Sequence, residues 1–74
     1  MRPASEVLRE TGKRIQLARR AAEMTQAALA EASDCDRTFI GGVERGERNV
    51  SLATLVRIAQ ALGRDVRDLI PSSN

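Results

Sequence analysis

Residues 25–44 read TQAALAEASDCDRTFIGGVE and predict a short helix, a tight turn and a second helix. Thr25 and Asp36 are residues that commonly cap a helix, because a side-chain oxygen accepts a hydrogen bond from an amide of the first turn. Each predicted helix also has a brief apolar face, formed by Leu29 and Ala30 in the first and by Ile40 and Val43 in the second. A unit this small needs other helices around it. This is the construction of a helix-turn-helix, with its second helix displayed outward.

The length and composition of the chain limit its fold. At 74 residues, of which 42% are hydrophobic and 30% charged, there is room for one domain (residues 1–74) with a small core. Phe39 is the sole aromatic residue, so this core must be aliphatic. The formal net charge is only +2, with basic side chains in excess before residue 24, and a local basic patch of this kind can still attract DNA.

The inventory of reactive side chains argues against catalysis. Cys35 is the only cysteine and the chain has no histidine, so we expect no internal disulfide, no metal site, no cofactor and no enzymatic activity. Cys35 itself is interpreted as a small buried hydrophobe. No apolar run approaches the ~20 residues that a membrane span requires. We therefore expect a cytoplasmic, nucleoid-associated protein with no membrane partner.

Three further helices are predicted around the helix-turn-helix. Each begins at a capping residue, and the last two end at a residue that stops a helix. They run from Ser5 to about Ala22, from Ser51 to Gly63, and from Asp65 to Pro71. Together with the two helices of the motif, they predict an all-α fold, a compact five-helix bundle.

From Gly12 to Leu69 the chain resembles the Cro and phage-repressor type of helix-turn-helix regulators, the XRE family. The resemblance lies in GKRIQLARRAAEMTQAALAEA and DRTFIGGVERGERNVSLATLVRIAQALG, and ERGERNVSLATL is its most specific part. The segment DRTFIGGVERGERNVSL is most similar to the controller proteins of restriction-modification systems. The resemblance implies a lambda-repressor-like DNA-binding domain, and for a controller it implies autoregulation and timed expression of an endonuclease. We include RNA polymerase as a candidate partner.

Glu23 and Asp34 depart from the family pattern, because relatives often have glycine at these two positions. Glycine there would allow a left-handed backbone, which Asp tolerates better than most residues and Glu less readily. We expect the motif to survive, either with some backbone strain or with a longer first helix.

Arg37 and Thr38 are the side chains best placed to read DNA bases, because they follow the Asp36 cap in the first turn of the outward helix. Arg can direct two donors to guanine O6 and N7, and Thr can hydrogen-bond or contact the thymine methyl group. Gly41 is the third predicted base-reading position, since it and Gly42 leave the helix face uncluttered and let a backbone approach closely. The alternative is that both glycines are merely weak points of the helix.

Contacts to the DNA backbone are predicted for a second set of residues: Thr25, Gln26, Phe39, Arg48, Asn49, Ser51 and Arg20. Gln26 matches the phosphate-binding glutamine of the family, and by resemblance Arg48 faces DNA. Several alternatives remain open: a solvated helical face for Arg19 and Arg20, a packing position over a neighbouring loop for Phe39, an ion pair between Glu44 and Arg45, and an ion pair between Arg37 and Asp34.

The region of residues 51–70 is predicted to form a dimer interface. Val66, Leu69 and Ile70 are too many apolar residues for so short a terminal helix to bury against a small core, and Leu62 extends the same surface. Palindromic operators also require two-fold symmetry. We therefore expect the chain to bind a double-stranded DNA operator as a homodimer.

Three other readings compete with a dimeric regulator. They are an antitoxin-like module that covers a protein partner, the DNA-binding piece of a larger regulator, and an enzyme. The enzyme lacks catalytic side chains, and a partner-covering module would not require Gln26, Arg37 and Arg48 to coincide with a helix-turn-helix. Neighbouring reading frames would separate the dimeric regulator from the antitoxin. A methyltransferase with an endonuclease supports the controller, a toxin gene supports the antitoxin, and phage genes support a role in lysogeny.

Overall fold

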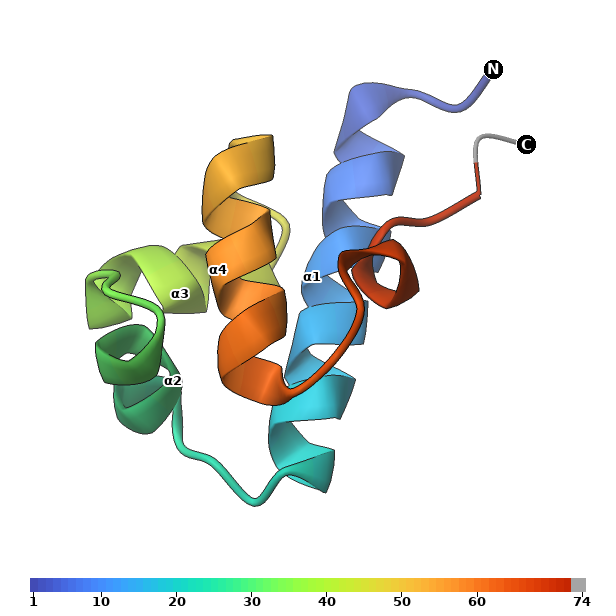
Figure 1. Cartoon of the computed structure of the whole chain (residues 1–74). Helices are drawn as coiled ribbons and strands as arrows, with labels where there is room; N and C mark the ends of the chain where they lie inside the picture. Colours follow the sequence, from blue (N-terminus) through green and yellow to red (C-terminus); the bar gives the residue numbers. More distant parts are fainter. Residues whose placement is uncertain (73–74) are drawn as a thin grey trace.

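The computed structural model describes residues 1–72, which form four α-helices and one terminal 3-10 turn (Figure 1). The elements are α1 (Ala4–Ala21), α2 (Gln26–Ala32), α3 (Arg37–Glu44), α4 (Leu52–Leu62) and η1 (Val66–Leu69). The long helix α1 packs against α3 and η1, while α4 packs against α2 and η1. Within the described residues, no helix combines the length and the apolar character that crossing a bilayer requires.

The core is aliphatic, as predicted, and every helix contributes to it. Its most deeply buried side chains are Ile15, Leu29, Ile40, Ile58 and Leu69, each at most 1% exposed. They come from α1, α2, α3, α4 and η1 in turn. Because no element is apolar on more than one face, each helix depends on the others to remove its apolar side chains from water.

The prediction of five helices is wrong, although the all-α class is confirmed. The last segment, Val66–Leu69, is a single 3-10 turn in which the Asp68 amide donates to the Asp65 carbonyl at 2.9 Å. Ile70 already has an extended backbone, with φ −95° and ψ 120°. A residue that precedes proline is disfavoured in the α conformation, so Pro71 ends the segment before an α-helical turn can extend.

Side-chain caps form at four of the five predicted positions. Thr25, Asp36, Ser51 and Asp65 each accept a hydrogen bond from an amide in the first turn of the helix that follows. Ser5 does not, because α1 begins at Ala4 with Pro3 as its N-cap and no side-chain cap. At the other end of the helices, Gly63 has φ +68° after α4, as expected for a left-handed C-cap.

Gly12 allows α1 and α3 to cross in close contact, a role that the sequence pattern did not reveal. A Cβ atom at Gly12 would overlap the Val43 carbonyl oxygen and lie 2.7 Å from that of Glu44. Any side chain at this position would therefore push the two helices apart. The last turn of α3 is thus fixed directly against the middle of α1.

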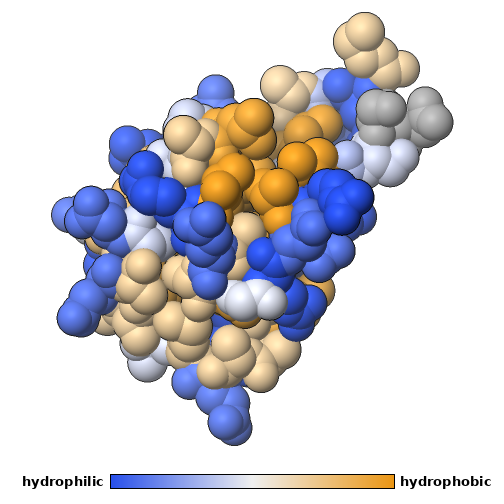
Figure 2. Space-filling view, in the orientation of Figure 1, coloured by the Kyte–Doolittle hydropathy of each residue, from blue (hydrophilic) through white to orange (hydrophobic). Residues whose placement is uncertain are grey.

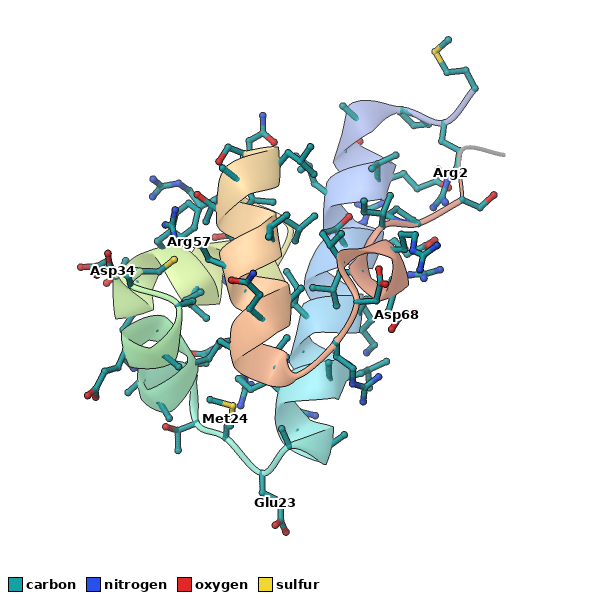
Figure 3. All side chains as sticks on the ribbon, in the orientation of Figure 1. Arg2, Glu23, Met24, Asp34, Arg57 and Asp68 are labelled. Carbon is teal, nitrogen blue, oxygen red and sulfur yellow. The ribbon has the colours of Figure 1, made fainter. Side chains whose placement is uncertain are left out.

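Glu23 and Asp34 both adopt the left-handed conformation, with φ of 56° at each residue. Of the two outcomes expected at these positions, the structure has the strained backbone, and α1 is not extended beyond Ala21. Both side chains are exposed and point away from the helices (Figure 3). Neither side chain is packed into the core, so the unfavourable free energy at these two positions comes from the backbone conformation alone.

Replacing Glu23 with glycine should therefore stabilise the fold. A left-handed conformation costs roughly 1–2 kcal/mol for most L-residues, and less for Asp, whose side chain can bond locally. Glu23→Gly should raise the free energy of unfolding by about 1 kcal/mol, and the matched Asp34→Gly by less. Chemical denaturation measures both. If Asp34→Gly stabilised more than Glu23→Gly, the assignment of the larger strain to Glu23 would be wrong.

Candidate nucleic-acid interface

Arg37 and Thr38 are exposed in the first turn of α3, where the sequence placed them. Asp36 Oδ1 accepts a hydrogen bond from the Thr38 amide at 2.7 Å, which anchors the start of the helix. Within residues 1–72 the Arg37 side chain has no ion pair or hydrogen bond, so the alternative pairing with Asp34 is absent. A guanidinium with all its donors free is thus presented at the N-terminus of the helix.

A buried ion pair joins the end of α1 to the end of α3. Arg19 Nε donates to Glu44 Oε2 at 2.6 Å and Nη2 donates to Oε1 at 3.0 Å, while Nη1 donates to the Met24 carbonyl at 2.8 Å. The Glu44 side chain is only 1% exposed, and that of Arg19 is 11% exposed. Hydrogen bonding to Glu44 raises the pKa of Arg19 above its ordinary value.

This pair corrects two interpretations of the sequence. Arg19 is neither a phosphate ligand nor part of a solvated face, because its donors are committed inside the protein. Glu44 pairs with Arg19 and not with Arg45, whose Nε instead donates to the exposed Glu47 at 3.0 Å. Arg20 remains exposed, so of the two arginines only Arg20 can still reach a phosphate.

Gln26 belongs to the same buried network. Its Nε2 donates to Glu44 Oε1 at 3.0 Å, and its side chain is half-buried. The first residue of α2 is thereby bound to the last residue of α3. Gln26 is the predicted phosphate ligand at the start of α2, and the hydrogen bond fixes where its amide lies relative to the outward helix.

Gly41 and Gly42 are both buried, so Gly41 is not displayed as a base-reading position. A Cβ atom at Gly41 would lie 3.2 Å from Arg45 Nη1 and 3.7 Å from Gln26 Oε1. At Gly42 it would overlap the Cγ atom of Arg48. The close approach that two adjacent glycines suggested is therefore present, but the groups that approach are side chains of the protein itself.

Arg48 lies over the ring of Phe39, with the guanidinium carbon 5.5 Å from the ring centroid. This distance is within the range of a cation–π interaction. Phe39 is half-buried and packs against the core, whereas Arg48 is exposed. Phe39 thus contacts a residue of the following loop, and the Arg48 cation lies beside the first half of α3. The predicted contact of Phe39 with the DNA backbone stays a prediction.

The remaining predicted backbone contacts are the exposed residues Thr25, Asn49 and Ser51. Thr25 and Ser51 cap α2 and α4, and Asn49 Oδ1 accepts from the Val50 amide at 2.9 Å. These local hydrogen bonds order the segments that lead into α2 and α4.

Arg57 is a structural residue of the site that the sequence reading missed. Its Nε donates to the Ser33 carbonyl at 3.1 Å, and its Nη2 lies 3.9 Å from Cys35 Sγ. Arg57 therefore ties α4 to the turn between α2 and α3. Cys35 is half-buried and packs against the core, consistent with its interpretation as a small hydrophobe.

The predicted dimer residues divide into core and surface. Leu62 is 7% exposed and Leu69 1% exposed, so both belong to the core and their assignment to an interface is wrong. Val66 is half-buried, and Ile70 is 44% exposed. Leu52, at the start of α4, is 66% exposed. Figure 2 shows apolar surface gathered along one side of α4, toward η1 and the start of α1.

A helix-turn-helix family model matches residues 15–69 of this chain. Control protein C.SmaI of Serratia marcescens is 51% identical over 47 residues, which cover 64% of this chain and 56% of the relative. Control protein C.BamHI of Bacillus amyloliquefaciens is 47% identical over 47 residues, which cover 64% and 58%. The chain thus spans little more than half the length of these two relatives.

Solved structures of two restriction-modification controller proteins are also similar. C.AhdI from Aeromonas hydrophila superposes with a TM-score of 0.83 at 43% identity, covering 85% of this chain and 96% of that one. C.Esp1396I superposes with a TM-score of 0.77 at 36% identity, covering 80% and 78%.

Proposed function

Because this chain belongs to the helix-turn-helix family, we propose that it regulates transcription by binding a palindromic DNA operator as a homodimer. The observation that carries the proposal is the contrast between paired and free charges. Arg19, Glu44, Arg45 and Glu47 are engaged within the protein, whereas Arg37 is exposed without a partner among residues 1–72. The similar proteins are control proteins and restriction-modification controllers, which supports a regulator and not an enzyme.

We assign base reading to Arg37 and Thr38, which would enter the major groove with the N-terminal turn of α3. Only that groove shows a distinct pattern of donors, acceptors and methyl groups for each base pair. Asp36 caps the helix just before them, so they are the first side chains on α3 free to reach a base edge. Arg37 is the residue with the bidentate geometry that guanine favours.

We assign the DNA backbone to the residues that frame α3. Gln26 lies at the start of α2. Arg48 lies in the loop between α3 and α4, with its guanidinium over the ring of Phe39. Thr25, Asn49 and Ser51 add exposed hydroxyl and amide groups next to Gln26 and Arg48 in the sequence, and Arg20 adds an exposed cation at the end of α1. Contacts of this kind fix the register of a protein on the duplex without reading sequence.

The similarity to controller proteins supports a narrower role, in which the chain controls the genes of a restriction-modification system and its own gene. Such a regulator would work in the cytoplasm on the nucleoid, and RNA polymerase is the partner through which it would activate a promoter. Expression of an endonuclease would then be delayed until the regulator accumulates.

Arg37→Ala should cost about 1–3 kcal/mol of binding free energy per half-site and relax selectivity at one base position, because a bidentate guanine contact is lost. Arg48→Ala should weaken binding to all operator sequences more evenly and reduce the slope of log K against log salt by about one. Titration of mutated operators at several salt concentrations measures both effects.

Thermal unfolding provides the control for these two variants. Arg37 is exposed and unpaired, so Arg37→Ala should keep the free energy of unfolding within about 0.5 kcal/mol of the wild type. Arg48→Ala also loses the contact with Phe39 and should cost about 0.5–1 kcal/mol. An Arg37→Ala protein that retained the base preferences of the wild type would refute the assignment of base reading to Arg37.

The dimer is expected to form through the exposed apolar side chains of α4 and of the segment after η1. Ile70→Arg should give a monomer in sedimentation and weaken operator binding, because a charge at an apolar interface loses its hydration. Leu17→Arg on α1 is the matched comparison, since Leu17 is 55% exposed and Ile70 is 44% exposed. If Leu17→Arg gave the monomer and Ile70→Arg remained dimeric, the interface would lie on α1 instead.

A further inference from the structure

Gly42 and Arg48 are in contact, and the sequence pattern did not predict this contact. A Cβ atom at Gly42 would overlap Arg48 Cγ and lie 3.5 Å from both Cβ and Cδ of the same side chain. The aliphatic stem of Arg48 therefore lies directly on the backbone of α3. Beyond the stem, the guanidinium lies over the Phe39 ring, one helical turn earlier.

We propose that Gly42 is a positioning residue for Arg48, and that Gly42 and Phe39 together form a seat that holds this arginine beside the DNA-reading turn of α3. The proposal rests on the proposed function, since the value of the seat is to present a cation to DNA. Gly42 supplies the floor that the stem crosses, and Phe39 supplies an aromatic face for the guanidinium. Thr38, the neighbour of Phe39, is one of the assigned base readers.

The seat accounts for a glycine that otherwise weakens its helix. Glycine is among the least favourable residues for a helix interior, and alanine the most favourable. Gly42 is buried and α-helical, so no positive φ requires glycine here. A long exposed arginine that is already held in place loses less rotamer freedom when it binds than a free one would.

Gly41 offers a matched control one residue away. It is also buried and helical, but a Cβ atom there would meet only the far end of Arg45 and, at an ordinary contact distance, the Gln26 amide. Gly41→Ala and Gly42→Ala therefore add the same methyl group to the same helix, and only Gly42→Ala displaces Arg48.

The first test observes the seat without DNA. The δ-methylene and Nε–H resonances of Arg48 in the full chain should be displaced by the ring current of Phe39. Gly42→Ala should move them toward the positions found in Phe39→Leu, while Gly41→Ala should leave them in place. Unchanged Arg48 resonances in a folded Gly42→Ala protein would overturn the proposal, whether or not the chain binds DNA.

The second test is a double-mutant cycle on a DNA duplex that the wild-type chain selects from a random pool. Gly42→Ala should weaken binding as much as Arg48→Ala, and the double variant should be no weaker than Arg48→Ala within a factor of about two. If Gly42→Ala lowered the DNA affinity equally in the wild-type protein and in the Arg48→Ala protein, Gly42 would not act through Arg48. A wild-type chain that selects no sequence would instead refute the proposed function and leave the resonance test to decide on the seat.

If Gly42→Ala unfolds the protein, the folding of the double variant Gly42→Ala/Arg48→Ala tests the proposal. Removing the arginine side chain removes the atoms that the new methyl group would overlap, so the double variant should fold again. A double variant that remained unfolded would show that Gly42 serves some other part of the core.

Discussion

The buried ion pair between Arg19 and Glu44 is the interaction on which the arrangement of the motif depends. It joins the last turn of α1 to the last residue of α3 through two hydrogen bonds. Glu44 also accepts a hydrogen bond from Gln26, so that one carboxylate holds three helices. A carboxylate that is 1% exposed is strongly unfavourable unless its charge is compensated. Arg19 provides that compensation, and this constrains where α3 can lie.

The site divides its charges into those that build the scaffold and those that remain available. Arg19 and Glu44 pair with each other and hold α1 against α3. Gly12 allows the two helices to approach closely enough for this ion pair to form. Arg37 and Thr38 are left exposed at the opposite end of α3. The helix α3, to which we assign base reading, is thus held at its C-terminus and exposed at its N-terminus, the end that a helix-turn-helix directs into the major groove.

Local features were predictable from the sequence because they depend on a few neighbouring residues. Caps at Thr25, Asp36, Ser51 and Asp65 are of this kind. The left-handed backbone at Glu23 and Asp34 was expected from the glycines that relatives have at these positions. The family resemblance supplied the helix-turn-helix and the outward placement of α3. The predicted base-reading and phosphate-binding roles stay predictions until DNA binding is measured.

Features that depend on packing between distant segments were not predictable. Arg19 and Glu44 are 25 residues apart, and nothing in the periodicity of either helix indicates the pairing. Leu62 and Leu69 looked like surplus apolar residues at the end of the chain, yet they complete the core, while Leu52 is exposed. Apolar spacing identifies one face of a helix but not which of its residues a neighbouring element will cover. The same limit applies to Gly41 and Gly42, whose neighbours include Gln26 of α2 and Arg48 of the loop after α3.

The most direct test of this account is a double-mutant cycle on the free energy of unfolding with Arg19→Met and Glu44→Met. Arg19→Met alone leaves the Glu44 carboxylate buried without its partner, so it should cost about 3–5 kcal/mol. The double variant should cost much less than the sum of the single variants, because no unpaired charge remains. Single variants within about 0.5 kcal/mol of the wild type, or costs that simply add, would contradict the claim that this pair holds the motif together.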